Sequence, residues 1–276
     1  MISRNRYKLV VSDIDGTIMD RGGKISAEDM AAIAEARSHG VMVSLSSGRA
    51  RGACLGIISQ LSLDNYHIFF DGALVSSPDL KKEVYARPID GAIVKNMIEM
   101  SHEMGMDLEL YSAASYFVER ETWSTQAHRD FFEIAPAMVD FSGIWERERV
   151  VKGLTAITNA EEAVKVKKFR QQFGEKLHFS EARTPAYPGV TFINILAAET
   201  SKGKAMEALA AHLGIPLAEV MAVGDGSNDV ALLSSAGLAV AMGNALNEVK
   251  AVADYVTLDV DHSGLAAAIR KFVLPD

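Results

Sequence analysis

The chain of 276 residues is poor in cysteine and tryptophan, with one and two of them, and aromatic residues make up only 7% of it. Its single thiol, Cys54, cannot form an internal disulfide, which is expected of a protein kept in a reducing compartment. No segment approaches the roughly 20 consecutive apolar residues that a membrane-spanning helix needs. Residues 1–13 carry charges and no long apolar segment, so we expect no signal peptide, no membrane partner and a cytoplasmic location.

Positive charge is also in deficit, because 28 lysines and arginines stand against 36 aspartates and glutamates, a net charge of -8. A nucleic-acid-binding surface usually requires a basic face, so we expect no nucleic-acid partner. Apolar residues, by contrast, make up 49% of the chain, enough for a substantial core in one large domain or two ordinary ones. The composition gives no indication of the oligomeric state.

Strand-like and helix-like segments alternate at both ends of the chain. The run at residues 8–12 is short and continuously apolar, as is typical of a strand in a parallel sheet covered on both faces. Further strand-like segments occur at residues 41–45, 66–70, 219–223, 238–242 and 254–258. Helical patterns follow them, and Ser26 and Ser201 are predicted as the N-caps of two of these helices. The order predicts an α/β fold with a Rossmann-like, mostly parallel sheet and helices on both faces.

The middle of the chain follows another pattern. A helix near 91–104 and a helix near 160–173 each precede two strand-like runs, a weak αββ repeat that predicts an antiparallel sheet with helices on one face. Between the repeats, residues 122–150 look mainly helical, and we expect their two tryptophans to lie in the core. We therefore predict an α/β core formed by residues 1–84 and 194–276, and an inserted α+β domain at 85–193.

Polar clusters follow the strands of the predicted core, where ligands collect beyond the carboxyl ends of parallel strands. They are Asp13 with Asp15, Ser46 to Arg49, Asp71, Asp225 to Asp229, and Asn244. In an extended chain the carboxylates of Asp13 and Asp15 point to one side. Together with Asp225 and Asp229 they indicate a divalent cation, and hard oxygen ligands favour Mg²⁺ over zinc. The cation would offset their repulsion and keep an aspartate ionised, able to attack phosphorus.

A phosphate group needs hydrogen-bond donors for its oxygens. Ser46, Ser47 and Gly48 lead into a helix, so we expect their backbone N–H groups to hold an anion and the Ser47 hydroxyl to assist. Lys202 lies in the first turn of a predicted helix, where a cation is unfavourable for the helix dipole. Neutralising a phosphoryl group would justify that position.

Four segments in this order, "DIDGT", "SSGR", "SKGKAMEAL" and "GDGSND", resemble the four motifs of the haloacid dehalogenase (HAD) superfamily of phosphohydrolases. The later segment "VAMGNALNEVKAVADYVT" resembles the Cof-type branch of that superfamily. The size and position of the insert resemble the C2-type cap domain, subtype B, of that branch. Such a cap would cover the active-site crevice and contact the substrate.

The resemblance implies a role for each matching residue. Asp13 would be the nucleophile that forms an aspartyl-phosphate and would also contact the metal. Asp15 would be the general acid and base, with its backbone carbonyl on the metal. Lys202 would stabilise the charge of the phosphoryl group and of Asp13. Ser47, with Gly48, would bind the phosphoryl group.

The fourth motif would complete the metal site. Asp225 would be a Mg²⁺ ligand, and Asp229 would be either a further ligand or a partner of one. Asn228 would orient the phosphate or Lys202. Two positions depart from the common pattern, since Asp71 stands where this branch often has Asn, and Ser47 where Thr is frequent. Whether Asp71, Arg49 and Asn244 take part in the site stays open.

The expected activity is that of a Mg²⁺-dependent phosphatase acting on a small phosphorylated metabolite. A sugar phosphate is the first expectation, with phosphoglycolate and pyridoxal phosphate as alternatives. A phosphomutase would use the same residues and return the phosphoryl group to the substrate. A non-catalytic sensor of a phosphorylated ligand is the third possibility, but it would be expected to lack the nucleophile or a metal ligand.

Overall fold

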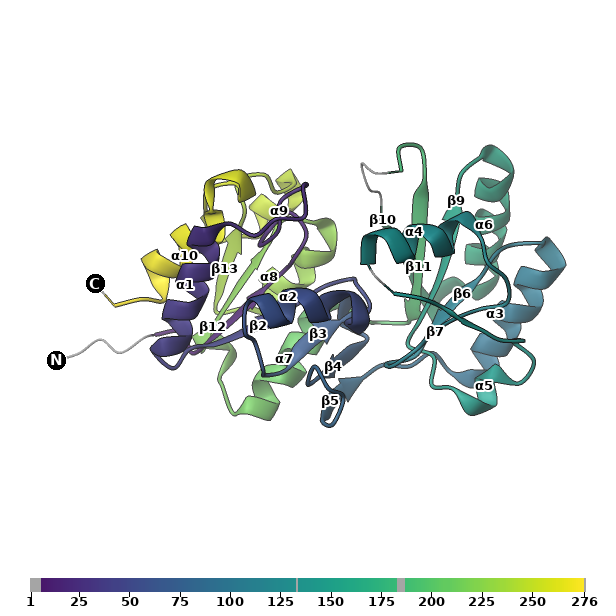
Figure 1. Cartoon of the computed structure of the whole chain (residues 1–276), viewed down its shortest axis with the longest axis horizontal. Coiled ribbons are helices and arrows are strands. Elements are labelled where there is room, and N and C mark those ends of the chain that lie inside the picture. The colour runs from purple at the N-terminus through teal and green to yellow at the C-terminus, as the bar shows by residue number, and fades with distance from the viewer. Residues whose placement is uncertain (1–5, 133, 183–186, 276) are drawn as a thin grey trace. The chain divides into compact units, whose positions relative to one another are not determined.

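The computed structural model describes residues 6–132, 134–182 and 187–275 (Figure 1). The chain divides into two compact units. The first comprises Met1–Arg49, Cys54–Tyr85 and Ser201–Asp276, and the second comprises Ala50–Ala53 and Ala86–Thr200. The insert predicted at 85–193 thus starts one residue before the second unit's main segment and ends seven residues before its end.

The first unit is built on a five-stranded sheet with the order β14-β13-β12-β1-β2, in which every neighbouring pair is parallel. Its strands are β1 (Leu9–Ser12), β2 (Met42–Leu45), β12 (Val220–Gly224), β13 (Leu238–Ala241) and β14 (Tyr255–Val256). The central strands β1, β12 and β13 are buried along their whole length, as their apolar runs predict. The predicted α/β fold with a parallel sheet is confirmed.

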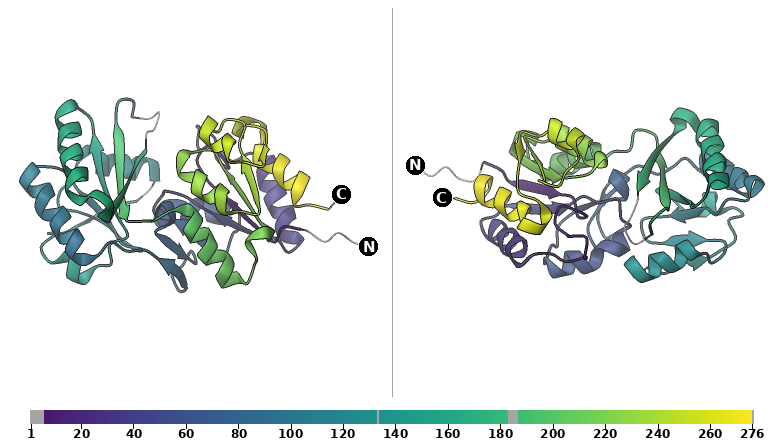
Figure 2. Two further views of the ribbon diagram at one scale, coloured as in Figure 1. Left: turned by 180° about the vertical axis from the view of Figure 1, so that it is seen from behind. Right: turned by 90° about the horizontal axis from the view of Figure 1, so that it is seen from above.

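Two helix pairs pack on this sheet, and Figure 2 shows them on opposite faces. One pair is α1 (Ala27–Ser38) with α10 (Gly264–Phe272), and the other is α7 (Lys202–Leu213) with α8 (Val230–Ser235). The shorter helices are α2 (Leu55–Gln60) and α9 (Asn247–Ala251). The hydroxyls of Ser26 and Ser201 accept hydrogen bonds from backbone N–H groups three residues on, so both predicted N-caps are confirmed.

The third predicted strand of the core does not join the parallel sheet as a full member. An isolated parallel bridge, Ser46 to Ile68, links it to the segment after β2. Instead β3 (His67–Phe69) pairs antiparallel with β4 (Leu74–Ser76), in a small sheet completed by β5 (Glu83–Ala86). The chain turns sharply between β3 and β4, through the short 3₁₀ helix Phe70–Gly72. This turn carries Asp71.

The second unit holds a six-stranded sheet with the order β10-β11-β9-β6-β7-β8. Its strands are β6 (Glu109–Tyr111), β7 (Tyr116–Val118), β8 (Ala137–Met138), β9 (Lys152–Ile157), β10 (Leu177–Ala182) and β11 (Thr191–Ala197). The helices are α3 (Gly91–Met104), α4 (Trp123–Phe132), α5 (Ile144–Arg147) and α6 (Ala160–Phe173). The two αββ repeats occur as predicted, but β9, in the middle of the sheet, was not predicted.

The αββ repeat predicted that the helices of the second unit lie on one face of its sheet, but they lie on both faces. One face carries an apolar core shared with α3 and α6, to which Leu110, Phe117 and Ile195 belong. On the other face α4 packs on polar side chains, because its Ser124 hydroxyl donates to the Glu109 carboxylate at 2.6 Å. Its first residue, Trp123, is 42% exposed, so the expectation of a core tryptophan there was wrong.

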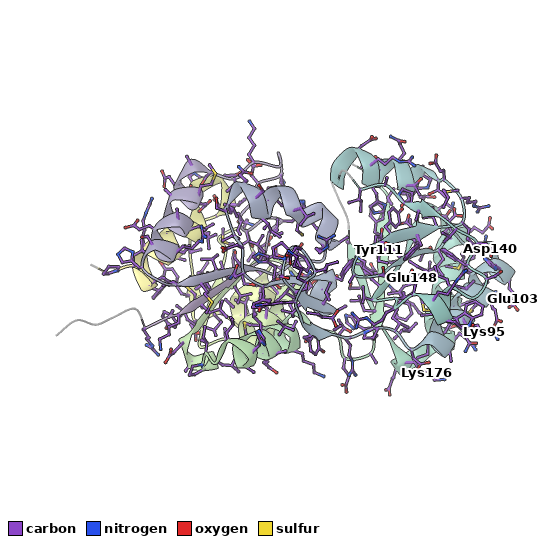
Figure 3. All side chains as sticks on the ribbon, turned by 60° about the horizontal axis from the view of Figure 1, so that its bottom comes forward. Lys95, Glu103, Tyr111, Asp140, Glu148 and Lys176 are labelled. Atoms are coloured by element: carbon purple, nitrogen blue, oxygen red, sulfur yellow. The ribbon has the colours of Figure 1, made fainter. Side chains whose placement is uncertain are left out.

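The surface of the second unit is charged, and Figure 3 labels Lys95, Glu103, Asp140 and Lys176 among its exposed side chains. In the part of the chain that the structure describes, no helix is both long enough and apolar enough to cross a membrane. Cys54 is buried and forms no disulfide.

Candidate active site

The site begins with a buried ion pair at the carboxyl end of β1. Asp13 follows this strand directly, and its backbone N–H donates to the Val223 carbonyl of the neighbouring strand at 2.9 Å. The Lys202 ammonium lies 2.5 Å from Asp13 Oδ1 and 2.6 Å from Asp229 Oδ1. Lys202 is the first residue of α7, and its side chain is fully buried. The two carboxylates hold its ammonium group in place. Residues from three separate segments of the chain thus meet at one point.

Three carboxylates share this point. Oxygens of Asp13, Asp225 and Asp229 all lie within 4.8 Å of one another. Burial raises the pKa of Asp13 well above its usual range, and the charge of Asp229 adds to this rise, while Lys202 opposes it. The pKa of Lys202 is raised as well: burial alone would lower it, but Asp13, Asp229 and Asp71 outweigh that effect. Burial is therefore the main cause of the rise at Asp13, whereas neighbouring carboxylates cause the rise at Lys202.

This donor set fits a divalent cation. Three carboxylates facing a single ammonium group carry two excess negative charges, which one divalent cation would balance. The ligands are all oxygens, the set that Mg²⁺ and Ca²⁺ prefer. The cluster can therefore hold a metal ion, and Asp13 and Asp225 would be its carboxylate ligands, with Asp229 beside them.

Asp229 is fixed by the backbone of its own loop. Its Oδ2 accepts hydrogen bonds from the N–H groups of Asp225 and Gly226, both at 3.0 Å, while Oδ1 faces Lys202. A side chain at Gly224 would not fit, since its Cβ would lie 2.6 Å from the Cβ of Asp229. In the folded segment "GDGSND", one oxygen of this carboxylate accepts hydrogen bonds from the loop backbone and the other accepts one from the Lys202 ammonium.

Asp225 is held by two polar side chains from other loops. The Thr17 hydroxyl donates to its Oδ1 at 3.0 Å, and the Asn244 amide lies 3.3 Å from its Oδ2 and 2.8 Å from the Gly16 carbonyl. Burial, followed by the charge of Asp229, raises the pKa of Asp225 to about 6. Sequence reasoning assigned no role to Thr17, although its place in the "DIDGT" motif was the available signal.

Asp15 does not converge with the buried carboxylates. Its side chain pairs with Arg49, whose Nε and Nη2 lie 2.8 and 2.5 Å from the two carboxylate oxygens. The chain bends at Ile14 instead of staying extended as expected, and the two side chains have different partners: a buried lysine for Asp13 and a partly exposed arginine for Asp15. The backbone carbonyl of Asp15, predicted as a metal contact, stays a prediction.

The expectation of free backbone donors at Ser46 and Ser47 was wrong. The Ser46 N–H donates to the Ser12 carbonyl at 2.8 Å, and the Ser47 N–H donates to the Ile68 carbonyl at 2.9 Å. Both N–H groups therefore already donate to carbonyl oxygens of neighbouring segments and are not available to a phosphate. The Ser47 hydroxyl accepts the Arg49 N–H at 3.1 Å and keeps its own proton to donate, so the side chain rather than the amide is the candidate phosphate donor.

Asn228 and Asp71 meet beside Gly48. The Asn228 amide nitrogen donates to Asp71 Oδ1 at 2.8 Å. A Cβ built on Gly48 would lie 2.8 Å from the same oxygen, so the Asp71 carboxylate packs directly against the backbone of that glycine. The structure therefore brings together Asp13, Lys202, Asp225 and Asp229 in one cluster, and links Asn228 to the Ser47–Gly48 segment through Asp71.

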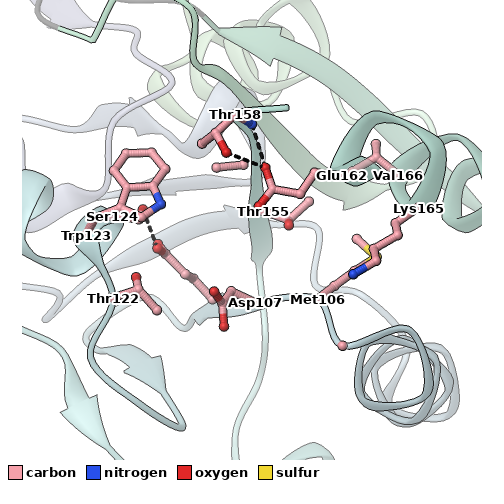
Figure 4. Close-up of a pocket in the computed structure, with 13 residues that line it drawn as sticks. Met106, Asp107, Thr122, Trp123, Ser124, Thr155, Thr158, Glu162, Lys165 and Val166 are labelled. Atoms are coloured by element: carbon pink, nitrogen blue, oxygen red, sulfur yellow. Dashed lines mark hydrogen bonds between the residues drawn. The ribbon is translucent and has the colours of Figure 1, made fainter. Parts of the chain in front are cut away.

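A second polar pocket lies within the second unit (Figure 4). Carboxylates and hydroxyls line it, among them Glu109, Ser124, Thr158 and Glu162. They bind one another: Glu109 accepts from Ser124, and Glu162 accepts from the backbone N–H and hydroxyl of Thr158 at 2.6 and 2.7 Å. Since no predicted site residue lines it and several of its polar groups pair with one another, we assign it to the structure of this unit.

The family of this chain follows from a match that covers most of its length. The model of haloacid dehalogenase-like hydrolases matches residues 10–269. The chain belongs to this family. The membership confirms the predicted superfamily and its α/β core, and it confirms that the chain is an enzyme, a HAD-type phosphoric monoester hydrolase.

Relatives of this HAD hydrolase align over nearly its whole length. Phosphatase YwpJ of Bacillus subtilis is 27% identical over 287 aligned residues, covering 96% of this chain and 100% of that protein. The 5-amino-6-(5-phospho-D-ribitylamino)uracil phosphatase YcsE of the same organism is 27% identical over 268 residues, covering 97% and 96%. A solved HAD subclass IIB sugar phosphatase is 25% identical with a TM-score of 0.78, covering 96% and 98%.

Proposed function

We propose that this enzyme is a Mg²⁺-dependent phosphatase that hydrolyses a small phosphorylated metabolite through an aspartyl-phosphate on Asp13. The observation that carries the proposal is the cluster in which Asp13, Asp225 and Asp229 surround the ammonium of Lys202. Its excess of negative charge suits a divalent cation, and its position at the carboxyl ends of parallel strands suits a ligand. Bound Mg²⁺ would supply charge neutralisation for the phosphoryl group and for Asp13.

The proposed reaction has two steps. In the first, the Asp13 carboxylate forms a bond to phosphorus while the bond from phosphorus to the leaving oxygen breaks, and Asp15 donates its proton to that oxygen. In the second, Asp15 takes a proton from water and the water oxygen bonds to phosphorus, while the bond from phosphorus to the Asp13 oxygen breaks, which gives inorganic phosphate and the free Asp13 carboxylate. Lys202 stabilises the charge on the phosphoryl oxygens, and the Ser47 hydroxyl donates to one of them.

The substrate proposed first is a sugar phosphate, and the second unit is proposed to set the specificity. The solved sugar phosphatase supports this class. The alternative substrates are a phosphorylated ribityl-pyrimidine, phosphoglycolate and pyridoxal phosphate. The first is included because one relative is named as a phosphatase of such a compound. We also propose a cytoplasmic location and no nucleic-acid partner.

The test is a release assay for inorganic phosphate with a panel of these compounds, with and without MgCl₂. We expect release that depends on both the substrate and Mg²⁺, and that falls by at least about a thousandfold in Asp13→Asn, because an amide cannot serve as this nucleophile. Full phosphate release by Asp13→Asn would refute the assignment. Transfer of phosphate to a second position of the substrate, without release, would indicate a phosphomutase instead.

A further inference from the structure

A strained turn holds Asp71 in place. Phe70, Asp71 and Gly72 have φ angles of 53°, 54° and 98°, and a left-handed conformation is costly for a bulky residue such as phenylalanine. The turn is also tightly packed, because a Cβ on Gly72 would lie 2.2 Å from the carbonyl oxygen of Ser201, the residue before α7. Strain of this kind persists only where surrounding contacts fix it, and here they fix the direction of a carboxylate.

Asp71 connects two loops that carry predicted phosphate-binding residues. Its backbone N–H donates to the Ser47 carbonyl at 3.0 Å, and the N–H of Phe70 donates to the Arg49 carbonyl at 3.1 Å. Its side chain accepts the Asn228 amide at 2.8 Å. Asp71 therefore holds the Ser47 loop through its backbone N–H and orients the Asn228 amide through its side chain.

The same side chain brings an additional negative charge to the phosphate-binding residues. Asp71 is buried, its oxygen packs against Gly48, and its charge acts on Lys202 at the centre of the site. Two charges of like sign repel more strongly where little solvent separates them. A phosphate dianion held by Lys202, Ser47 and Asn228 would experience this repulsion, whereas an asparagine in the same place would not exert it.

We propose that Asp71 is a positioning residue that holds the Asn228 amide, and that its charge weakens the binding of inorganic phosphate and so favours release of the product. The proposal rests on the proposed function of this site. Its two parts can be separated, because Asp71→Asn keeps an oxygen that accepts from Asn228 but removes the charge. Asp71→Ala removes the charge and the oxygen together.

The first experiment measures the affinity of the full-length protein for inorganic phosphate by calorimetry in excess MgCl₂. We expect Asp71→Asn to bind phosphate roughly tenfold more tightly than the wild type, because the repulsion is gone. Asp64→Asn is the matched control: it removes the same charge from a side chain that is 94% exposed, and it should leave the affinity unchanged. Equal or weaker binding by Asp71→Asn would overturn the role of the charge.

The second experiment compares Asp71→Ala with Asp71→Asn, which carry the same charge and differ in the hydrogen-bond acceptor. With Asn228 present, we expect Asp71→Ala to bind phosphate about tenfold more weakly than Asp71→Asn. In an Asn228→Ala background this difference should vanish, since there is no amide left to hold. A difference that persists in that background would overturn the positioning role.

Both readouts are binding constants, so they do not depend on turnover. Failure of the release assay with the expected changes in phosphate binding would reject the proposed phosphatase and, with it, the role in product release, but it would leave the effect of Asp71 on phosphate binding intact. Circular dichroism of each variant confirms that the compared proteins are folded. A general loss of structure could weaken phosphate binding but could not produce the tighter binding expected of Asp71→Asn.

Discussion

The Arg49 guanidinium donates two hydrogen bonds to the carboxylate of Asp15, one to each oxygen, at 2.8 and 2.5 Å. Asp15 is 59% exposed and could rotate freely in the absence of this partner. The arginine backbone belongs to the loop whose Ser47 hydroxyl accepts the Arg49 N–H. The pair therefore ties the proposed acid and base to the proposed phosphate-binding loop, a use for which a planar, two-pronged guanidinium is suited.

Arg49→Met should impair proton donation by Asp15 without removing the nucleophile. Poor leaving groups depend on a general acid, whereas nitrophenolate leaves without one, so the loss should depend on the substrate. We expect kcat/KM to fall at least about tenfold more for an alkyl phosphate than for 4-nitrophenyl phosphate. Asp15→Asn should show the same selectivity, and Arg49→Lys an intermediate loss. An equal loss on both substrates would mean that Arg49 acts on phosphate binding rather than through Asp15.

Lys202→Met should destabilise the metal-free protein. The ammonium is fully buried between two carboxylates, and removing it leaves them without a counter-charge, which typically costs about 3–5 kcal/mol. Urea unfolding should detect this loss, and adding Asp13→Asn to the variant should restore part of it because one of the repelling charges is removed. Lys204→Met, an exposed position two residues along the same helix, serves as the control. Equal stabilities of both lysine variants would contradict the pairing.

Asn244→Ala should weaken the binding of Mg²⁺. Its amide bridges the Asp225 carboxylate and the Gly16 carbonyl, and partners that orient a metal ligand are typically worth about 10–100-fold in metal affinity. Titration calorimetry with MgCl₂ alone should show a loss of roughly tenfold. Asn159→Ala is the matched control, because it removes an amide that caps α6 in the second unit. Unchanged Mg²⁺ affinity in Asn244→Ala would remove this residue from the site.

The core of the fold could be predicted because its strands are mostly apolar and two of its helices, α1 and α7, start at serine caps. The strand β9 could not, because it begins with Lys152 and Gly153, which break the apolar pattern. Lys152 is nevertheless buried, on a sheet that also buries Glu109. A strand that contains charged residues cannot be predicted from its hydrophobic pattern, because the burial of those residues depends on partners elsewhere in the chain.

The cluster around Lys202 could be predicted in outline, because strand ends in a parallel sheet meet at one edge. The partners within it could not. Asp15 pairs with Arg49 across 34 residues, and the amides of Ser46 and Ser47 are taken by backbone carbonyls of other segments. Such contacts are set by how loops cross one another, for which residue spacing carries no signal.

His67 should make the stability of the first unit depend on pH. Its ring is buried in β3, and its Nδ1 accepts the N–H of Leu45 at 3.1 Å, which requires an unprotonated nitrogen. Burial lowers the pKa of His67 to about 4, from an ordinary value near 6.5. Above pH 6.5 the ring is neutral in both the folded and the unfolded chain and has no effect. Below it, the unfolded chain binds a proton that the folded chain refuses, so stability falls as the pH drops towards 4.

The expected contribution at pH 5 is a loss of about 2 kcal/mol relative to pH 7, because a difference of one pKa unit corresponds to about 1.4 kcal/mol. Urea unfolding of the wild type and of His67→Gln at both pH values measures it. The variant loses a packed ring and should be less stable at pH 7, yet its further loss between pH 7 and pH 5 should be smaller by this amount. His39→Gln, at an exposed position, should keep the wild-type pH dependence. An identical pH dependence of wild type and His67→Gln would show that the buried ring is protonated without cost, and that Leu45 finds another acceptor.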